Sequence, residues 1–359
     1  MELSKIQKQI IEAKESYVLV NSCAGSGKTR CLVHRLQYLL DTGIDPSKIV
    51  AITFTNAAAD EILERLSNPN GLFVGTIHSY ANQLLLRGGV NTADILDKEQ
   101  FDKLFSRIKK HPECIEEVEY LLLDEGQDST AKQFEFALKT INPKNWMIFS
   151  DHRQSIFRFA DATPEYLLGL MEHPDVTVYD LTENYRNSPE ILDYAKGIIK
   201  YCGPEYNDRS KAMRDSEGKV ITVPYSPTGI CLTIQRYVEE GRCTYGDWFV
   251  LTRTNAQSED MIRMLKKMGI PCDSFKKANL DSKGLKGKMR ENTVKVLTIH
   301  TAKGLEAKNV IVIGAHYKDV EERCLCYVAA TRARDLLVWT MSSKPRKTRK
   351  SPDIEYWGG

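Results

Sequence analysis

The stretch Ala24-Gly25-Ser26-Gly27-Lys28-Thr29 has the residue types of a loop that binds phosphate groups. Glycines let the backbone turn so that successive N–H groups point at phosphate oxygens. In this pattern Lys28 reaches the β and γ phosphates, and Thr29 offers its hydroxyl to Mg²⁺. A helical pattern follows the loop, and a helix N-terminus favours anions. The strict pattern has glycine at position 22, where this chain has Ser22. The spacing still predicts a nucleotide site rather than a plain glycine-rich turn.

An acidic pair supplies the second part of such a site. Asp124 and Glu125 follow the apolar run "YLLL". Asp124 is the natural partner for Mg²⁺, and Glu125 is placed to polarise an attacking water. Alone, an acidic pair after a strand is often a solvated loop. Together with the phosphate loop it predicts hydrolysis of a nucleoside triphosphate.

The elements that must position these residues follow from the hydrophobic pattern. We expect a helix over residues 4–14 with Ser4 as its N-cap, and the first strands at 16–22, 48–56, 72–79, 118–126 and 145–151. A second series of β-rich runs starts near residue 176. Strands that alternate with helices predict an α/β fold of parallel sheets covered on both faces, with ligands at the carboxyl edge. We therefore expect two similar halves, 1–175 and 176–343.

Composition limits the other possibilities. The chain has 359 residues, 42% hydrophobic and 27% charged, which is typical of a soluble protein of roughly two domains. No run approaches the ~20 apolar residues of a membrane span, and the N-terminus does not resemble a signal peptide. Nine cysteines without CxxC pairs favour reduced thiols, no zinc site and a cytoplasmic location. The net charge of +2 does not indicate nucleic acid, but lysine-rich residues 266–290 and 344–350 could contact a phosphate backbone or be solvated surface.

Several further segments, taken in order, resemble the UvrD/Rep/PcrA-type helicases of superfamily 1. They include "ITFTNAAADEI" (52–62), "GTIHSYA" (75–81), "SDHRQSIFRFADA" (150–162), "LTENYRNSPEIL" (181–192), "VLTIHTAKGLEAKNV" (296–310) and "ERCLCYVAATRAR" (322–334). The resemblance implies two tandem RecA-like P-loop domains with ATP in the cleft between them. It also implies an ATP-dependent 3′–5′ translocase or helicase on single-stranded DNA, with ATP and Mg²⁺ as cofactors.

The resemblance assigns further roles residue by residue. Gln7 resembles the glutamine that recognises adenine, and Arg30 and Tyr185 the pair that flanks its ring. Gln154 resembles the glutamine that senses the γ phosphate, and Glu306 a glutamate near the ribose. Arg186 and Arg332 match two arginines that reach the γ phosphate from the second domain. Two such arginines imply that the site is complete only when the halves close, so that domain motion is the output.

The resemblance also implies a track for single-stranded DNA across both halves. The residues that it assigns to this track are Phe54, Thr55, Asn56, His78, Phe157 and Phe159, with His300 as a contact or coupling residue. Aromatic faces stack on any base and so tolerate sequence, although such rings are also common in protein cores. The expected partner is single-stranded DNA, either free or as the tail of a duplex, bound by a monomer away from membranes.

The chain departs from the family in composition and in length. Ala307 replaces an aromatic after "GLE", "ADA" (160–162) replaces "RGA", and Gly126 replaces alanine. The missing arginine weakens the expected grip on DNA. Two large family insertions are reduced to residues 82–117 (a remnant of subdomain 1B) and 265–292 (in place of 2B). We therefore expect a compact form in which translocation is better supported than unwinding, with a basic tail at 344–359.

Two other functions remain open at this point. One is a DNA-stimulated ATPase that displaces or recruits proteins without processive unwinding. The other is a nucleotide-dependent switch that controls partner binding and does not travel. A kinase-like transferase is the weakest alternative, since it does not explain paired arginines in a second half.

Overall fold

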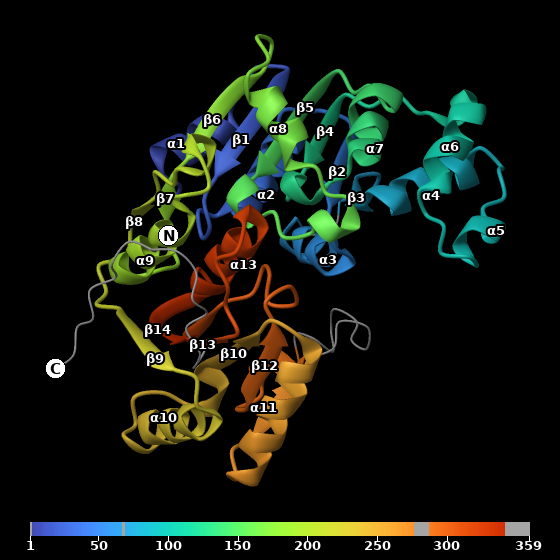
Figure 1. Cartoon of the computed structure of the whole chain (residues 1–359). Coiled ribbons are helices and arrows are strands. Elements are labelled where there is room, and N and C mark those ends of the chain that lie inside the picture. Colours follow the sequence, from blue (N-terminus) through green and yellow to red (C-terminus); the bar gives the residue numbers. More distant parts are fainter. Residues whose placement is uncertain (1, 67–68, 276–286, 342–359) are drawn as a thin grey trace.

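Two six-stranded parallel sheets organise the chain in the computed structural model, which describes residues 2–66, 69–275 and 287–341 (Figure 1). The first sheet has the order β3-β2-β4-β5-β1-β6. Its strands are β1 (Tyr17–Ser22), β2 (Ile49–Thr53), β3 (Phe73–Thr76), β4 (Tyr120–Leu123), β5 (Asn145–Ser150) and β6 (Thr177–Leu181). The tandem α/β architecture expected from the sequence is confirmed.

The second sheet has the order β11-β12-β10-β13-β14-β9. Its strands are β9 (Lys219–Pro224), β10 (Trp248–Thr252), β11 (Cys272–Ser274), β12 (Val294–Thr298), β13 (Ala307–Ile313) and β14 (Ala333–Met341). A short parallel pair, β7 (Glu183–Asn184) and β8 (Lys211–Ala212), lies between the two sheets in the sequence.

Helices cover both faces of the first sheet because its strands are apolar on both sides. Val18 and Val20 of β1 pack with α1 (Lys5–Ile11), α2 (Lys28–Asp41) and α3 (Asn56–Arg65). Leu19, on the opposite face, belongs to a core that includes α4 (Ile77–Arg87), α5 (Ala93–Leu96), α6 (Lys103–Lys110), α7 (Ala131–Phe134) and α8 (Pro164–Met171). This alternation is the mark of a strand buried on both faces.

The second sheet is built in the same way. Phe249 and Leu251 pack with α9 (Pro189–Ile199) and α13 (Val320–Ala330). Trp248 and Val250 face α10 (Pro227–Glu239) and α11 (Asn255–Lys267). Helix α13 lies between the two sheets (Figure 1), where it also contacts the turn His152–Gln154 of the first half. The junction of the halves is thus packed around α13.

Side-chain caps determine where several elements begin, and one of them corrects the sequence prediction. Ser4 caps α1 through a capping box with Gln7, as expected. The predicted strand at 72–79 is wrong at its end, because β3 stops at Thr76. The Thr76 hydroxyl accepts from the Ser79 backbone N–H, so "IHS" forms the first turn of α4.

The boundary between the halves also differs from the sequence prediction. Strand β6 was expected to begin the second half, at residue 176, but it pairs in parallel with β1 of the first sheet, with Thr177 opposite Val18. The strand is only partly buried and lies at the edge of the sheet. Hydrophobic patterning cannot tell which sheet an edge strand joins, because pairing partners are set by long-range contacts.

The regions expected to replace the family insertions are short. Residues 82–117 hold the rest of α4 with α5 and α6, which lie beyond β3 at one side of the molecule (Figure 1). Region 265–292 holds the end of α11 and β11, and its residues 276–286 lie outside the described residues, as does the tail 344–359. Among the described helices, none has the length and apolar character needed to cross a membrane.

Candidate nucleotide site between the two sheets

The glycine loop connects β1 to α2 at the carboxyl edge of the first sheet. Gly25 and Gly27 have φ of +66° and +82°, the left-handed region that glycine enters without steric cost. Lys28 begins α2, so the helix N-terminus opens directly from the loop. Ser22 departs from the glycine of the strict pattern without disturbing the loop. Its hydroxyl is buried and donates to the Ser150 backbone oxygen of β5 at 2.6 Å.

The acidic pair lies opposite the loop lysine. Lys28 Nζ is 3.9 Å from Glu125 Oε1. Glu125 has φ of +53°, uncommon for a residue with a side chain, and such strain clusters at functional sites. Burial, followed by the charge of Glu125, raises the pKa of Asp124 to about 7. Burial acts in the same direction on Glu125, but Lys28 and Lys303 outweigh it and its pKa is lowered. The second carboxylate is therefore the one that stays ionised and can act as a base.

The donor set beside the loop suits Mg²⁺. In the ranges that the structure describes, no group of three or more His, Cys, Asp or Glu side chains is placed to hold a metal ion. Thr29 and Asp124 provide one hydroxyl and one carboxylate. Mg²⁺ typically takes few protein ligands and keeps waters and phosphate oxygens in its remaining positions. The residues thus fit a cation that arrives with a nucleotide.

Arg332 reaches the first half from the second. Its side chain is 1% exposed, and its Nη2 donates to Gln154 Oε1 at 3.0 Å. The Gln154 amide in turn donates to Asp151 Oδ2 at 2.7 Å. Burial, with the nearby charge of Arg186, lowers the pKa of Arg332 to about 9, so the guanidinium remains charged at neutral pH. The predicted γ-phosphate sensor and one predicted arginine are thus in direct contact.

Arg186 lies directly against the glycine loop. A Cβ placed on Gly25 would be 2.6 Å from Arg186 Cβ. The side chain bonds Glu306 Oε2 through Nε at 2.5 Å, and Glu306 also pairs with Arg334 at 3.6 Å. Asn184, which the sequence did not single out, donates to the Ala24 backbone oxygen at 2.7 Å and accepts from the Arg186 backbone N–H. In this structure Glu306 is therefore a partner of the arginines; a ribose role for it stays a prediction.

The residues predicted to surround adenine lie beside the loop. Gln7 is fully buried, and its Nε2 donates to the Ser26 backbone oxygen at 3.2 Å. The Tyr185 backbone N–H donates to the Gly25 oxygen at 2.9 Å, and its hydroxyl donates to Glu183 at 2.9 Å. Arg30 follows on the first turn of α2 and is half-buried. The structure brings these side chains to one end of the loop, and their contact with a base stays a prediction.

An ion pair between the halves was not predicted from the sequence. Lys303, between β12 and β13, places its Nζ at 2.7 and 2.6 Å from the two carboxylate oxygens of Asp128. The Asp128 side chain is fully buried. Burial raises its pKa to about 6 although Lys303 opposes the shift. Both residues lie inside segments that matched the family, in "DEGQD" and "TAKGLE", but only the fold shows that they meet.

A second buried network of ion pairs and hydrogen bonds, also not predicted from the sequence, holds the end of β1 just before the glycine loop. Arg153 pairs with Asp151 at 2.7 Å and with Asp208 at 3.3 Å, and it donates to the Ser22 backbone oxygen. The Tyr327 hydroxyl of α13 donates to Asp208 at 2.8 Å. A fully buried arginine is tolerated here because carboxylates and a carbonyl satisfy it.

Four of the rings predicted to contact DNA form one cluster. Phe157 is buried and lies 5.0 Å from Phe54, 5.8 Å from Phe159 and 5.8 Å from His300, measured between ring centroids. Phe54 and Phe159 are 39% and 71% exposed, so they form the outer surface of the cluster. Phe54 follows β2 of the first sheet and His300 follows β12 of the second. The aromatic cluster therefore spans both halves.

The remaining DNA candidates have local structural partners. His78 hydrogen-bonds Asp102 at 3.2 Å and stacks on Phe105 of α6 at 5.1 Å. Thr55 caps α3 through the Ala58 backbone N–H, and Asn56 is exposed at the start of that helix. The local contacts of His78 and Thr55 do not require DNA, and DNA contact by all three residues stays a prediction.

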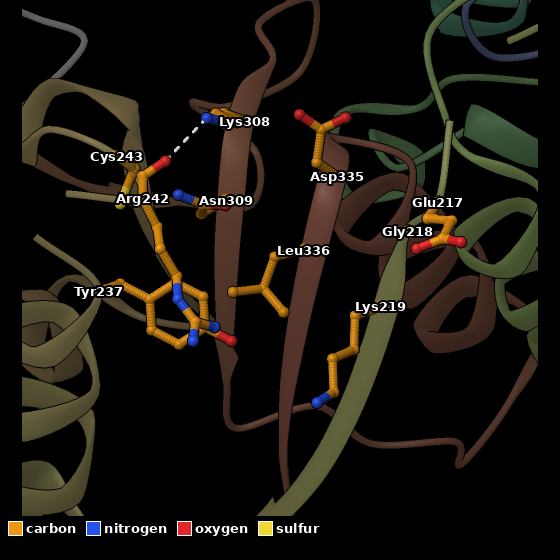
Figure 2. A pocket seen from close by; sticks show the side chains of 10 residues that line it. All are labelled: Glu217, Gly218, Lys219, Tyr237, Arg242, Cys243, Lys308, Asn309, Asp335 and Leu336. Atoms are coloured by element: carbon orange, nitrogen blue, oxygen red, sulfur yellow. Dashed lines mark hydrogen bonds between the residues drawn. The ribbon is translucent and has the colours of Figure 1, made fainter. Parts of the chain in front are cut away.

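A pocket of about 330 Å³ lies elsewhere, at the starts of β9, β13 and β14 (Figure 2). Figure 2 shows the Arg242 guanidinium beside the Tyr237 ring and the Lys308 ammonium bonded to the Arg242 backbone oxygen. None of the residues predicted to bind the nucleotide lines this pocket. The pocket is therefore distinct from the candidate nucleotide site.

Comparison with known families agrees with this geometry. The UvrD/REP helicase N-terminal domain model matches residues 3–113 and 101–175, and the UvrD-like helicase C-terminal domain model matches residues 274–344. The two models together cover the glycine loop, the acidic pair, Lys303 and Arg332.

Individual relatives are more distant. An ATP-dependent DNA helicase PcrA of Leuconostoc citreum is 26% identical over 364 positions, covering 74% of this chain and 48% of the relative. The PcrA of Bacillus subtilis is 25% identical, covering 75% and 49%. A probable DNA helicase of Mycoplasma pneumoniae is 24% identical, covering 93% and 82%. This chain thus spans about half the length of the PcrA relatives. The alignment with the Leuconostoc citreum relative spans 364 positions but includes only 74% of the 359 residues of this chain, so the alignment contains gaps in this chain.

Proposed function

This chain belongs to the UvrD-like helicase family, and from that premise we propose that it is an ATP-driven motor that moves 3′ to 5′ along single-stranded DNA. ATP with Mg²⁺ is the proposed cofactor pair, and the cytoplasm the proposed location. In this proposal each sheet with its helices forms one domain, and the motion of one domain relative to the other is the mechanical output.

The contact between Arg332 and Gln154 carries this proposal. It joins a buried cation of the second half to a side chain of the first half at 3.0 Å, next to the loop that begins α2. A guanidinium is suited to stabilise charge on transferring phosphoryl oxygens, since it offers forked donors and keeps its charge. We propose that Arg332 and Arg186 complete the hydrolytic site, with Lys28 on the phosphates and Glu125 orienting water. Loss of the γ phosphate then weakens the tie between the halves.

The aromatic cluster supports single-stranded nucleic acid as the track. The exposed rings Phe54 and Phe159 belong to the first half, and half-buried His300 of the second half lies in the same cluster. Exposed rings stack on bases without regard to sequence, at about 1–3 kcal/mol per base. Because Phe54 and His300 come from different halves, closing and opening of the halves changes their spacing. Such a change moves a bound strand relative to the rings.

A DNA-stimulated ATPase that remodels proteins and unwinds poorly is the second candidate. It is favoured by the short segment between α4 and β4, which holds α5, α6 and a 3₁₀ turn, and by the gaps in the alignment with the PcrA relative. The motor residues are the same in both candidates. The two candidate functions differ in whether duplex DNA is opened.

Two assays separate these functions. We expect the ATPase rate to rise severalfold with oligo(dT), and a 3′-tailed duplex to be displaced in preference to a 5′-tailed one. Stimulation without displacement would favour the remodelling candidate. A rate that is independent of single-stranded DNA would refute both motor functions and favour a nucleotide-dependent switch.

A further inference from the structure

Two buried asparagines hold the backbone around Arg186. Asn184 and Asn187 are both 0% exposed. Asn184 Oδ1 accepts from the backbone N–H groups of Arg186 at 2.9 Å and of Asn187 at 2.8 Å. Asn184 Nδ2 donates to Asn187 Oδ1 at 2.8 Å and to the Ala24 backbone oxygen of the glycine loop at 2.7 Å. The side chains of Asn184 and Asn187 thus form one unit, the amide pair, which fixes the turn around Arg186 to the glycine loop.

The second member of the amide pair reaches the backbone on both sides of Arg332. Asn187 Nδ2 donates to the Thr331 backbone oxygen at 3.2 Å and to the Ala333 backbone oxygen. The Arg186 guanidinium also donates to the Thr331 oxygen, at 3.4 Å. The amide pair therefore joins the two backbone segments that carry the proposed catalytic arginines, although these segments are far apart in the sequence.

Hydrogen-bond counting shows that each amide has one favourable orientation. An asparagine side chain has two N–H donors and a carbonyl oxygen with two acceptor positions. Asn184 uses all four, and Asn187 uses both donors and one acceptor position. If either amide turned over, N–H groups would face N–H groups and oxygens would face oxygens, away from water. A buried polar network that is satisfied to this degree is rigid and specifies one geometry.

We infer that Asn187 is a positioning residue that fixes where Arg186 and Arg332 lie relative to each other. The inference rests on the proposed function, because these are the two arginines proposed to complete the hydrolytic site. The Asn187 side chain bonds Asn184 and two backbone oxygens, so it acts on the reaction through the arginines. Each guanidinium must meet developing charge at hydrogen-bond distance, and a misplacement of about 1 Å can lower catalysis about 100-fold.

The test measures phosphate release by Asn187→Ala in two backgrounds, at saturating ATP and oligo(dT). In the otherwise unaltered chain, Asn187→Ala should lower kcat about 10- to 100-fold, while the Kd for ADP stays within about threefold. In the Arg332→Ala chain it should lower kcat by less than about threefold more, because residues that act as a unit lose their effect together. Asn187→Ser, whose hydroxyl can donate to one of the two oxygens, should give an intermediate kcat, and it serves if the alanine variant does not fold.

Gln235→Ala is the matched control. The Gln235 amide on α10 also donates to a backbone oxygen, that of Met268 at the end of α11, at 3.2 Å. Its loss should change thermal stability and leave kcat within about threefold of the unaltered chain. A kcat for Asn187→Ala within about threefold of this control, or an equal fold loss in both backgrounds, would overturn the inference while leaving the motor function standing. An unaltered chain without ATPase activity, or a normal rate in Arg332→Ala, would overturn the proposed hydrolytic site and the positioning role with it.

Discussion

Gly25→Ala tests whether the close seating of Arg186 on the glycine loop matters for hydrolysis. The new Cβ would lie 2.6 Å from Arg186 Cβ and 3.3 Å from Arg186 N. Carbon atoms in contact are normally about 3.5–4.0 Å apart. The atoms in the way are a Cβ and a backbone nitrogen, which cannot swing aside as the end of a long side chain can. Arg186 must therefore retreat from the loop by about 1 Å.

The expected magnitude follows from two separate costs. A side chain in the left-handed region costs about 1–2 kcal/mol, since Gly25 has φ of +66°. A misplacement of about 1 Å can lower catalysis about 100-fold. We thus expect kcat to fall about 100-fold, while ADP, which lacks the phosphate that Arg186 is proposed to reach, loses about tenfold in affinity at most.

Gly269→Ala separates strain from contact. Gly269 has φ of +70°, and nothing lies within 4 Å of a Cβ built there. This control should lose similar stability in thermal melts and keep its ATPase rate with oligo(dT). Steady-state phosphate release measures kcat, and titration of a fluorescent ADP measures affinity. A kcat for Gly25→Ala within about threefold of the control would refute the reasoning, because hydrolysis would then not depend on the close packing of Arg186 against the glycine loop.

Further predictions concern the same site and the aromatic cluster. Glu125→Gln should abolish turnover but keep ATP binding, and retained phosphate release would show that water is activated elsewhere. Arg332→Ala should lower kcat by about 10³-fold or more with little effect on oligo(dT) binding in anisotropy titrations; a normal rate would remove it from its proposed role. Phe159→Ala, at a ring 71% exposed, should weaken oligo(dT) binding by about 1–3 kcal/mol without loss of thermal stability; unchanged affinity would exclude Phe159 as a stacking platform. The pKa of Asp128 in the folded chain is about 6, above its ordinary value of 3.8, so the folded chain binds this proton more tightly than the unfolded chain does. The contribution of Asp128 to the free energy of unfolding should therefore fall as pH rises from about 4 to about 6. The pair Asp128→Asn with Lys303→Met should remove this pH dependence and match or exceed the original stability in urea titrations at pH 7; a loss of several kcal/mol would contradict this expectation.

Much of the fold follows from local sequence, because short apolar runs and helical periodicity are local signals. The glycine loop, the acidic pair and the strands that lead into them were predicted at their observed places. The predicted strands at 48–56 and 72–79 are too long, since β2 stops at Thr53 and β3 at Thr76, and β6 was assigned to the wrong half. Each kind of error has one source. A threonine hydroxyl capped a helix within an apolar run, and an edge strand chose its sheet through distant pairing.

The candidate site was predictable only in part. Lys28, Glu125 and Arg332 could be named from motifs whose chemistry and spacing are visible in the chain. The tie of Lys303 to Asp128 and the packing of Arg186 on Gly25 could not. Each of these contacts joins residues more than 150 positions apart, and a motif does not record distance in space.

The amino-acid sequence alone established the class of fold and the chemistry of the phosphate loop, since both depend on neighbouring residues. The folded chain established which charges face one another across the two halves. Local sequence cannot show these contacts, because a buried ion pair such as Lys303 with Asp128 forms only where two segments far apart in the sequence pack together and exclude water.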